Sequence, residues 1–509
     1  MRIGLSDRLS VSMGKIIDLF QHGVLENYPL FTFIVSNAPQ RLGAKACYAR
    51  AFKEFEIAFE NVPAYKRFLE DSGWRCKGGN IREIFESLPV MDKANYILPY
   101  STEDRCLEGM FFRKGVVVDE SSGSTGIPYN WVRSEHERET VKKVIAVYLR
   151  YCFGADKFIV LNTFSMGAWA TGFNMALAAQ SLGVVKSTGP DVDKIFYTMQ
   201  FFGNKYPYIL NGYPPFMKYL IDEGEKRGFP WHEYTIHVMV GGEGMSEGLR
   251  DYVSRYAKTV FSGYGASDLE IGLGGENPLT VKIRKMCLSN PKLKKALFGD
   301  DQRLPMLFQY NPLDHLIEII DGEVVVTISK PWTLSPRIRY NIKDEGGMIT
   351  FSEIKEKLAE HGIDLLKIAR ECNYPRWNLP FLFVYGRKDS TISVMGANIY
   401  PEDVENVVYS DLELGKSINS YMISLEEDCE GNPRPCFEFE LSDTNPKVWI
   451  EERLASVLPE GLARLSLDFK KAKEEYPQAV KPIIRIFGPE EGPFKQNLGR
   501  IKKKYVKKG

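Results

Sequence analysis

The chain has 509 residues, which is too long for one ordinary hydrophobic core and predicts several domains. Its 66 basic and 66 acidic residues cancel, so the net charge favours no nucleic-acid partner. No apolar run approaches the roughly 18 to 20 residues that cross a bilayer, and the N-terminus lacks the core of a signal peptide. The eight cysteines include no C-x-x-C pair. We therefore expect a cytoplasmic protein without a membrane span.

Helical and strand patterns then follow one another along the chain. Residues 41–60 carry apolar side chains at helical spacing. From about residue 157, predicted strands alternate with predicted helices. The strands are 157–164, 208–210, 235–240 and 258–262, and the helices are 174–182, 214–228 and 246–257. This alternation predicts a parallel α/β sheet, in which ligands bind at the carboxyl ends of the strands.

Two glycine-rich segments follow predicted strands at such ends. We interpret both as turns: "GGEG" at 241–244 and "GYGASD" at 263–268. Further on, "LIEIIDGEVVVTIS" predicts a β-hairpin that turns at Asp321 and Gly322. After about residue 385, shorter strand and helix patterns predict a smaller α+β unit.

A Ser-, Gly- and Thr-rich run, "DESSGSTGIPYNW", extends from Asp119 to Trp131. Glycines at 123 and 126 let a backbone approach an anion, and the hydroxyls at 121, 122, 124 and 125 add donors. The run does not match the G-x-x-x-x-G-K-[ST] pattern of P-loops. It therefore predicts either a phosphate-binding loop or a flexible turn.

Six segments in order along the chain carry a family resemblance. They are "SSGSTGIP" (121–128), "GGE" (241–243), "GYGASDLE" (263–270), "RIRYNIKDEG" (337–346), "GRKDSTISVMGANIYPEDVE" (386–405) and "NLGRIKKK" (497–504). Here the chain resembles the adenylate-forming superfamily of acyl-CoA synthetases, luciferases and adenylation domains, and within it the phenylacetate–CoA ligase branch. The likeness covers the chain from about residue 115 to its end, and "VPAYKRFLED" (62–71) extends it toward the N-terminus.

The resemblance implies roles for particular residues. The loop residues Ser122, Gly123, Ser124, Thr125 and Gly126 would grip the leaving phosphates of ATP. Gly241, Gly242, Glu243, Tyr264 and Gly265 would border the adenine, and Asp344 with Arg387 would hold the ribose.

Four further residues would serve the reaction and the domain movement. Ser267 would reach the α-phosphate, and Asp268, in place of the usual Glu, would bind Mg²⁺. Asp389 would be the hinge of the C-terminal domain, and Gly396 would border the pantetheine tunnel. Without the resemblance, Asp268 is also a candidate for a helix N-cap.

Three departures from the family pattern affect the expected rate. Tyr129 follows the loop proline where many relatives have a Lys. Residues 350–385 form a longer link than usual. The C-terminal catalytic Lys is replaced by Arg500, whose planar guanidinium is not an equivalent point donor, so Lys495, Lys502 or Lys503 are alternatives.

Two other functions stay open at this stage. Residues 244–248, "GMSEG", match the G-x-S-x-G nucleophile elbow, with His315 and His361 later in the chain. Ser246 is six residues beyond the predicted strand, however, which favours a helix cap instead. The second alternative is a non-catalytic or acyl-transfer relative that binds an adenylate but has lost efficient adenylation.

The resemblance thus predicts an ATP- and Mg²⁺-dependent, AMP-forming carboxylic acid–CoA ligase that acts through an acyl-adenylate, on an aryl acid such as phenylacetate. The fold expected is a large N-terminal α/β domain over 1–385, with a mainly helical lead-in over 1–110, and a small mobile α+β domain over 386–509. Residues 164–173 and 211–215 are candidates for the acid pocket by analogy of position. A carrier protein or an amine could replace CoA as acceptor, and a homodimer is an open alternative.

Overall fold

The computed structural model describes residues 5–37, 40–76, 78–120, 129–154, 157–301, 303–372, 377–387, 392–394, 397–427, 433–443, 448–475, 477–478, 480–497 and 505–506. The chain divides into two compact units. The first comprises Met1–Gly189, Gly263–Phe298 and Pro305–Tyr385, and the second comprises Pro190–Ser262, Gly299–Leu304 and Gly386–Gly509. The domain bounds expected from the sequence, 1–385 and 386–509, stay a prediction.

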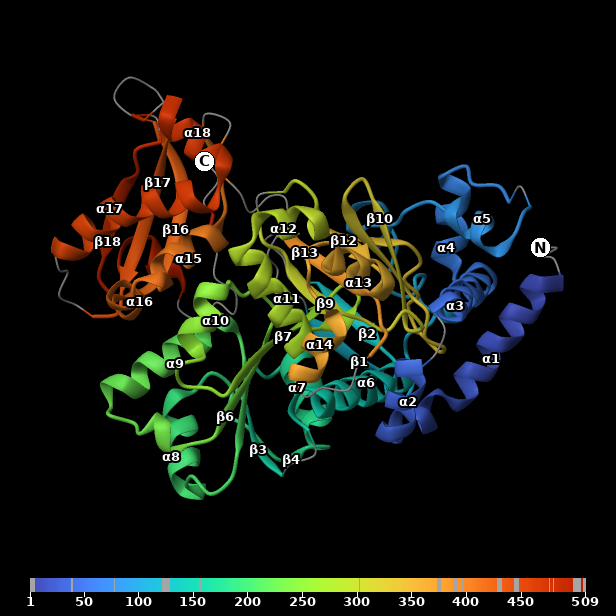
Figure 1. Ribbon diagram of the computed structural model, residues 1–509. Helices are drawn as coiled ribbons and strands as arrows, with labels where there is room; N and C mark the ends of the chain where they lie inside the picture. The colour runs from blue at the N-terminus through green and yellow to red at the C-terminus, as the bar shows by residue number, and fades with distance from the viewer. Residues whose placement is uncertain are drawn as a thin grey trace. The chain divides into compact units, whose positions relative to one another are not determined.

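Helices form the start of the first unit (Figure 1, blue). They are α1 (Leu5–Glu26), α2 (Tyr28–Asn37), α3 (Gln40–Asn61), α4 (Pro63–Asp71) and α5 (Ile81–Glu86), followed by the short turns η1 (Lys93–Ile97) and η2 (Leu107–Gly109). The helix expected over 41–60 is confirmed as α3, whose Phe52 and Phe55 are fully buried. Helix α1 packs against α3.

The strands of the first unit fall into three groups. The strands are β1 (Val117–Glu120), β2 (Asn130–Arg133), β3 (Phe158–Asn162), β4 (Gly183–Ser187), β7 (Thr259–Ala266, which starts in the second unit), β8 (Glu270–Gly275), β9 (Met306–Gln309), β10 (His315–Ile320), β11 (Glu323–Ile328), β12 (Tyr340–Ile349) and β13 (Phe381–Arg387). Strands β1 and β2 form a hairpin, and β3 pairs with β4 in parallel. The others lie in the order β10-β11-β12-β13-β9-β8-β7.

The parallel pairing expected for the strands between 157 and 262 is confirmed for β3 with β4, whereas the strands that follow along the chain form antiparallel pairs. Strands β3 and β4 are parallel, but β7 with β8, β8 with β9, β9 with β13, and β10 with β11 are antiparallel pairs. The hairpin at Asp321 and Gly322 is confirmed, and both residues have the positive φ, 53° and 79°, that a two-residue turn with matching twist requires. Short connections of this kind force neighbouring strands to run in opposite directions.

Helices cover the strands of the first unit. They are α6 (Glu135–Phe153), α7 (Ala170–Ala179), α11 (Pro278–Ser289), α12 (Pro291–Phe298), α13 (Phe351–Glu360) and α14 (Leu365–Glu371). Helix α6 begins at the N-cap Ser134 with a capping box to Glu137, and it packs against β8 and α7. The helix expected over 174–182 begins and ends earlier, as α7.

The second unit contains α8 (Val192–Phe202), β5 (Tyr208–Gly212), α9 (Pro214–Lys226), η3 (Trp231–Glu233), β6 (Ile236–Gly241), α10 (Glu247–Val253), β14 (Ile392–Val394), β15 (Ala397–Ile399), α15 (Pro401–Ser410), α16 (Leu412–Ser417), β16 (Ile418–Glu427), β17 (Pro433–Leu441), α17 (Val448–Leu465), α18 (Leu467–Glu475), β18 (Ile483–Phe487) and η4 (Gly492–Asn497). Strands β5 and β6 are parallel, as expected. Strand β17 lies between β16 and β18, and α15 packs against α10 and α17. In the part of the chain that the structure describes, no helix is both long and apolar enough to cross a membrane.

Candidate active site

The end of β7 and the turn into β8 carry the central residues of the predicted site. The segment 263–268 was expected to be a turn, but its first four residues continue β7, and the turn begins at Ser267. Strand register shifts between Tyr264 and Ala266, so the backbone bulges there. A Cβ on Gly265 would lie 2.8 Å from both the Glu270 oxygen and the Ile271 Cα, so this position requires glycine.

Asp268 is held by neighbours rather than by a helix. Its Oδ2 accepts a 2.7 Å hydrogen bond from the Tyr340 hydroxyl, and its backbone oxygen accepts one from Arg337 Nε at 3.0 Å. The residue precedes strand β8, so the alternative reading as a helix N-cap is wrong. The residue is half-buried.

Tyr264 and Asp344 form a second polar pair in the same unit. The Tyr264 hydroxyl donates to Asp344 Oδ2 at 2.6 Å, and its ring stacks on Phe308 with centroids 5.3 Å apart. Burial, reinforced by the Asp344 carboxylate, raises the pKa of Tyr264 well above its usual range, so the hydroxyl stays a donor. Asp344 was expected to bind ribose, and the hydrogen bond from Tyr264 fixes the orientation of its carboxylate.

The antiparallel strands β1 and β2 contact this turn. The loop, 121–128, lies outside the described residues, but the strands on either side of it are described. Arg133 on β2 donates from Nη2 to the Ser267 backbone oxygen at 2.7 Å, and its Nε lies 3.7 Å from Asp119 Oδ2 on β1. The base of the loop is thus anchored to the residue expected to reach the α-phosphate.

Two cations lie beside Tyr129, where relatives often have a loop Lys. Lys93 Nζ is 5.6 Å and the Arg105 guanidinium carbon 5.4 Å from the centre of the Tyr129 ring, and Arg105 Nη2 donates to the Tyr129 hydroxyl at 2.5 Å. The sequence reading missed both, because they are 36 and 24 residues before Tyr129 and share no motif with it. They restore positive charge near the base of the loop.

A buried ionic cluster lies next to Asp268. Glu270, two residues further on, accepts from Lys330 Nζ and pairs with His315 Nε2 at 2.5 Å. Burial alone would raise the pKa of Glu270, but Lys330 and His315 outweigh it and lower this pKa to about 2. The three side chains come from β8, the start of β10 and the segment after β11, so no local pattern predicted them.

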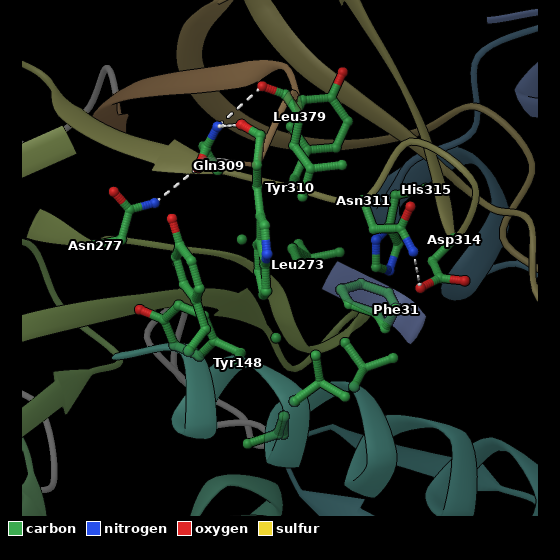
Figure 2. Close-up of a pocket in the computed structure, with 18 of the residues that line it drawn as sticks. Phe31, Tyr148, Leu273, Asn277, Gln309, Tyr310, Asn311, Asp314, His315 and Leu379 are labelled. Carbon is green, nitrogen blue, oxygen red and sulfur yellow. Dashed lines mark hydrogen bonds between the residues drawn. The ribbon is translucent and has the colours of Figure 1, made fainter. Parts of the chain in front are cut away.

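A largely apolar cavity of about 60 Å³ lies in the first unit, between α6 and β8 (Figure 2). Glycines of β8 let α6 come close: a Cβ on Gly275 would lie 2.2 Å from the Tyr148 ring. Gly274 pairs directly with Tyr264 on β7, so the cavity and the polar pair occupy neighbouring strands. At one wall, Asn277 donates to Gln309, which in turn donates to the backbone oxygens of Trp377 and Leu379.

In the second unit, the "GGE" segment follows β6 as expected. Gly241 ends the strand, and Gly242 has φ 85°, with Tyr213 2.9 Å from the position of a Cβ. Ser246 is 1% exposed and accepts from the Leu249 amide at 3.1 Å, so it caps α10. A buried, capping hydroxyl is not the exposed nucleophile of a hydrolase elbow.

The remaining predicted residues are placed as follows. Arg387 is exposed at the end of β13, and Lys495 is exposed in η4. The loop residues Ser122 to Gly126, the hinge Asp389, Gly396, Arg500, Lys502 and Lys503 lie outside the described residues. Their roles stay predictions.

Comparisons with known proteins support the resemblance. The chain is 24% identical to a phenylacetate–coenzyme A ligase of Thermus thermophilus over 357 residues, which is 69% of this chain and 71% of that protein. It is 23% identical to the phenylacetate–coenzyme A ligase of Aromatoleum evansii over 73% of this chain and 76% of that protein. No protein-family model matches.

A solved structure shows the fold. The chain is similar to the crystal structure of 2-hydroxyisobutyryl-CoA ligase in its postadenylation state, bound to an acyl-AMP. The similarity covers 94% of this chain and 91% of the ligase chain, with a TM-score of 0.67 and 12% sequence identity. The expected α/β fold of adenylate-forming enzymes is therefore confirmed, as is the resemblance to phenylacetate–CoA ligases. The mobility of the small C-terminal domain stays a prediction.

The residues present fit a divalent cation bound together with nucleotide. Mg²⁺ keeps several waters and takes phosphate oxygens, so one or two carboxylates are enough on the protein side. Asp268 offers a carboxylate that Tyr340 holds through one of its two oxygens. Among the described residues no group of three His, Cys, Asp or Glu side chains could hold a metal ion.

Proposed function

We propose that the protein is an AMP-forming carboxylic acid–CoA ligase that activates its acid with ATP as an acyl-adenylate. The observation that carries this proposal is the β7–β8 turn, where Asp268 is fixed by Tyr340, and Asp344 is fixed by Tyr264 on the preceding strand. The similarity to phenylacetate–CoA ligases over about 70% of the chain supports it. Preorganised polar groups of this kind stabilise the charge that builds up when a carboxylate meets a polyphosphate.

In this proposal each side chain has a physical task. Asp344, pinned by Tyr264, accepts hydrogen bonds from the ribose hydroxyls. Ser267 lies at the start of the turn, where Arg133 orients its peptide group toward the α-phosphate. Asp268 holds Mg²⁺, which spreads the phosphate charge when bound. Lys93 and Arg105, beside Tyr129, supply the positive charge that the loop lacks at the leaving phosphates.

We place the acyl group in the cavity between α6 and β8. Its floor is the glycine-rich strand that begins directly after the Asp268 turn, so a carboxylate at Ser267 and an acyl end in the cavity lie along one hairpin. Gly272, the near end of the cavity lining, lies four positions after Asp268, which is roughly 13 Å of extended chain at most. The cavity is predominantly apolar, as acyl pockets require.

CoA as acceptor, a cytoplasmic location and a homodimer belong to the proposal as well. CoA is suggested by the similar proteins described above, which are phenylacetate–coenzyme A ligases. The second candidate function, a relative that binds adenylate without efficient adenylation, rests on Arg500 and predicts ATP binding without turnover.

Product analysis tests the proposal. Wild-type protein incubated with ATP, Mg²⁺, CoA and a panel of aliphatic and aryl acids should yield AMP, pyrophosphate and the acyl-CoA in equal amounts, measured by mass spectrometry. An Asp344→Ala variant should lose about ten-fold or more in kcat/KM for ATP, because ribose loses its acceptor. Asp364→Ala, which removes an exposed helix N-cap, is the matched control. Binding of ATP without AMP formation for any acid would support the second candidate instead.

A further inference from the structure

The two N-terminal helices form part of the wall of the cavity between α6 and β8. Leu25, in the last turn of α1, and Phe31, in the first turn of α2, both line this cavity, and both are buried. Figure 2 shows the ring of Phe31 among the lining side chains. The two helices precede every segment that carries the family resemblance, so the sequence did not predict this part of the wall.

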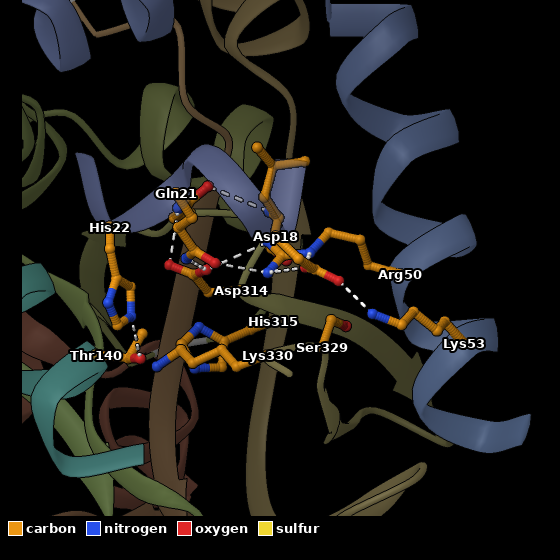
Figure 3. Close-up of polar contacts among 12 residues, drawn as sticks. Asp18, Gln21, His22, Arg50, Lys53, Thr140, Asp314, His315, Ser329 and Lys330 are labelled. Atoms are coloured by element: carbon orange, nitrogen blue, oxygen red, sulfur yellow. Dashed lines mark hydrogen bonds and ion pairs between the residues drawn. The ribbon is translucent and has the colours of Figure 1, made fainter. Parts of the chain in front are cut away.

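A buried polar network holds α1 in place (Figure 3). Arg50 of α3 is buried and donates from Nε to Asp18 of α1 at 3.0 Å and from Nη2 to Gln21 at 2.7 Å. Gln21 in turn donates from Nε2 to Oδ1 of Asp314 at 2.5 Å, and Asp314 also lines the cavity. Leu25 lies about one helical turn after Gln21, so the network fixes its position at the cavity wall.

Helix α2 is held to other lining elements near both of its ends. At its start, the guanidinium carbon of Arg150, on α6, is 4.8 Å from the centre of the Tyr28 ring. Near its end, the backbone amide of Asn378 donates to the Val35 oxygen at 3.1 Å. The residues on either side of Asn378 in the chain, Trp377 and Leu379, line the cavity. The helix is thus fixed to the body of the first unit.

The ring of Phe31 is itself packed. It meets the indole of Trp377 edge-on, with centroids 5.4 Å apart, and that indole stacks on Tyr151 at 3.7 Å. Trp377 and Tyr151 line the cavity as well. Side chains packed in this way have little freedom to move apart. An acyl group therefore has to fit the space that the Phe31 ring leaves.

The floor of the cavity, by contrast, is set by backbone. A Cβ on Gly275 would lie 2.2 Å from the Tyr148 ring, and the Tyr148 hydroxyl donates to the backbone oxygen of Glu276 at 2.5 Å. Changes there would disturb β8, which begins directly after the Asp268 turn. Leu25 and Phe31 belong to other elements, so their size can differ without altering that strand.

The volume of the cavity limits the acyl groups that fit. Its 60 Å³ is about twice the share of one water in the liquid, and an engineered cavity that binds benzene is about 150 Å³. A phenyl ring exceeds the space, whereas a short aliphatic chain fits it. The phenyl ring of Phe31 borders this space, so its removal would free the volume of one ring.

We propose that Leu25 and Phe31 determine the size of the acid, and that they restrict the protein to acids with a short aliphatic acyl group. This inference rests on the proposed function, because that proposal places the acyl group in this cavity. It replaces the aryl acid expected from the resemblance with a smaller, aliphatic one. It also makes the N-terminal helices part of the acid site.

The wild-type protein gives the first test. Acyl-CoA formation is measured with butyrate, hexanoate and phenylacetate. The better aliphatic acid should have a kcat/KM about ten-fold or more above that of phenylacetate, because overfilling a packed space forces side chains out of their preferred rotamers. An equal or higher kcat/KM for phenylacetate would overturn the inference and leave the proposed function standing.

Enlarging the cavity tests the role of Phe31. In Phe31→Ala the ratio of kcat/KM for phenylacetate to that for butyrate should rise about ten-fold or more, because a space opened by truncation collapses only partly. Phe33→Ala is the matched control, since Phe33 is on the same helix, is 66% exposed and does not line the cavity. Its ratio should equal that of the wild type. An unchanged ratio in folded Phe31→Ala would overturn the assignment.

Narrowing the cavity tests Leu25 in the opposite direction. In Leu25→Phe the ratio of kcat/KM for hexanoate to that for acetate should fall about five-fold or more, because the longer chain loses space. Leu19→Phe, at an 80% exposed position of α1 that does not line the cavity, is the control and should keep the wild-type ratio. A wild-type ratio in Leu25→Phe would contradict the role of Leu25.

The outcomes separate the inference from the proposed function. If Phe31→Ala fails to fold, as judged by its melting transition, the wild-type comparison and Leu25→Phe decide. If no acid of any class yields an acyl-CoA, the proposed function itself has failed. That result differs from a wild-type protein that activates phenylacetate as well as it activates hexanoate, which overturns the size limit alone.

Discussion

Two buried glutamates have pKa values that are shifted in opposite directions. Glu270 lies beside the candidate site in the first unit, and Glu405 lies on α15 in the second. Burial raises the pKa of both, but Lys330 and His315 reverse the effect at Glu270 and lower its pKa to about 2. At Glu405 a hydrogen bond from Ser246 opposes the rise, Glu402 and Glu243 add to it, and the pKa reaches about 8.

The difference shows that the neighbours, and not burial itself, decide the charge of a buried carboxyl. Glu270 is ionised at neutral pH, so it can hold Lys330 and fix His315 at the cavity wall. Glu405 is protonated at neutral pH, so it can pack between α15 and α10 without a cation. The first arrangement supports a ligand site, and the second supports the contact between two helices.

The two groups therefore contribute to stability in different pH ranges. The folded pKa of Glu270 is depressed, so its contribution is present above the unfolded value near 4.5 and is lost only as the pH falls toward about 2. The folded pKa of Glu405 is raised, so its contribution is complete below about 4.5 and is lost as the pH rises through about 8.

The largest expected effect comes from removing the cation beside Glu270. Lys330→Met should lower the free energy of unfolding by about 3–5 kcal/mol, because it leaves a buried carboxylate without its ion pair. Chemical denaturation at pH 7 measures this loss. The matched control is Lys194→Met, which breaks the exposed pair with Asp191 and should cost less than about 1 kcal/mol. Equal losses of unfolding free energy in the two variants would show that the buried Lys330–Glu270 pair contributes no more to stability than the exposed Lys194–Asp191 pair.

A smaller effect is expected at Glu405. Glu405→Gln cannot ionise, so its free energy of unfolding should fall less than that of the wild type between pH 6 and pH 9, by roughly 2–3 kcal/mol. Denaturation curves at the two pH values measure the difference. Glu413→Gln, at an exposed position of α16, should follow the wild type. A Glu405→Gln variant that loses as much stability as the wild type would show that the carboxyl is already ionised at pH 6.

Much of the fold followed from local patterns in the sequence. The helix over 41–60, the strands at 158, 208 and 236, and the hairpin at Asp321 and Gly322 were predicted because periodicity and turn residues act over a few positions. The extent of β7 was underestimated. Its glycines suggested a turn, whereas pairing with β8 holds Gly263 and Gly265 in a bulged strand.

The site was predictable only where it coincides with a motif. Asp268, Asp344 and Tyr264 belong to segments that resemble a known family, but the hydrogen bonds that fix them were not foreseen. Tyr340 is 72 residues from Asp268, and Lys330 is 60 residues from Glu270. Such partners are brought together by strand order, which periodicity within one segment does not encode.

The central claim is that the chain activates a carboxylate with ATP at the β7–β8 turn. Carboxylate-dependent exchange of labelled pyrophosphate into ATP measures this step without CoA. Wild-type protein should catalyse exchange with at least one acid. Asp268→Asn should lower the exchange rate about 100-fold, because it weakens the Mg²⁺ ligand. The control Asp193→Asn changes a side chain that is 82% exposed and should leave the exchange rate unchanged. Exchange by Asp268→Asn at the wild-type rate would contradict the account.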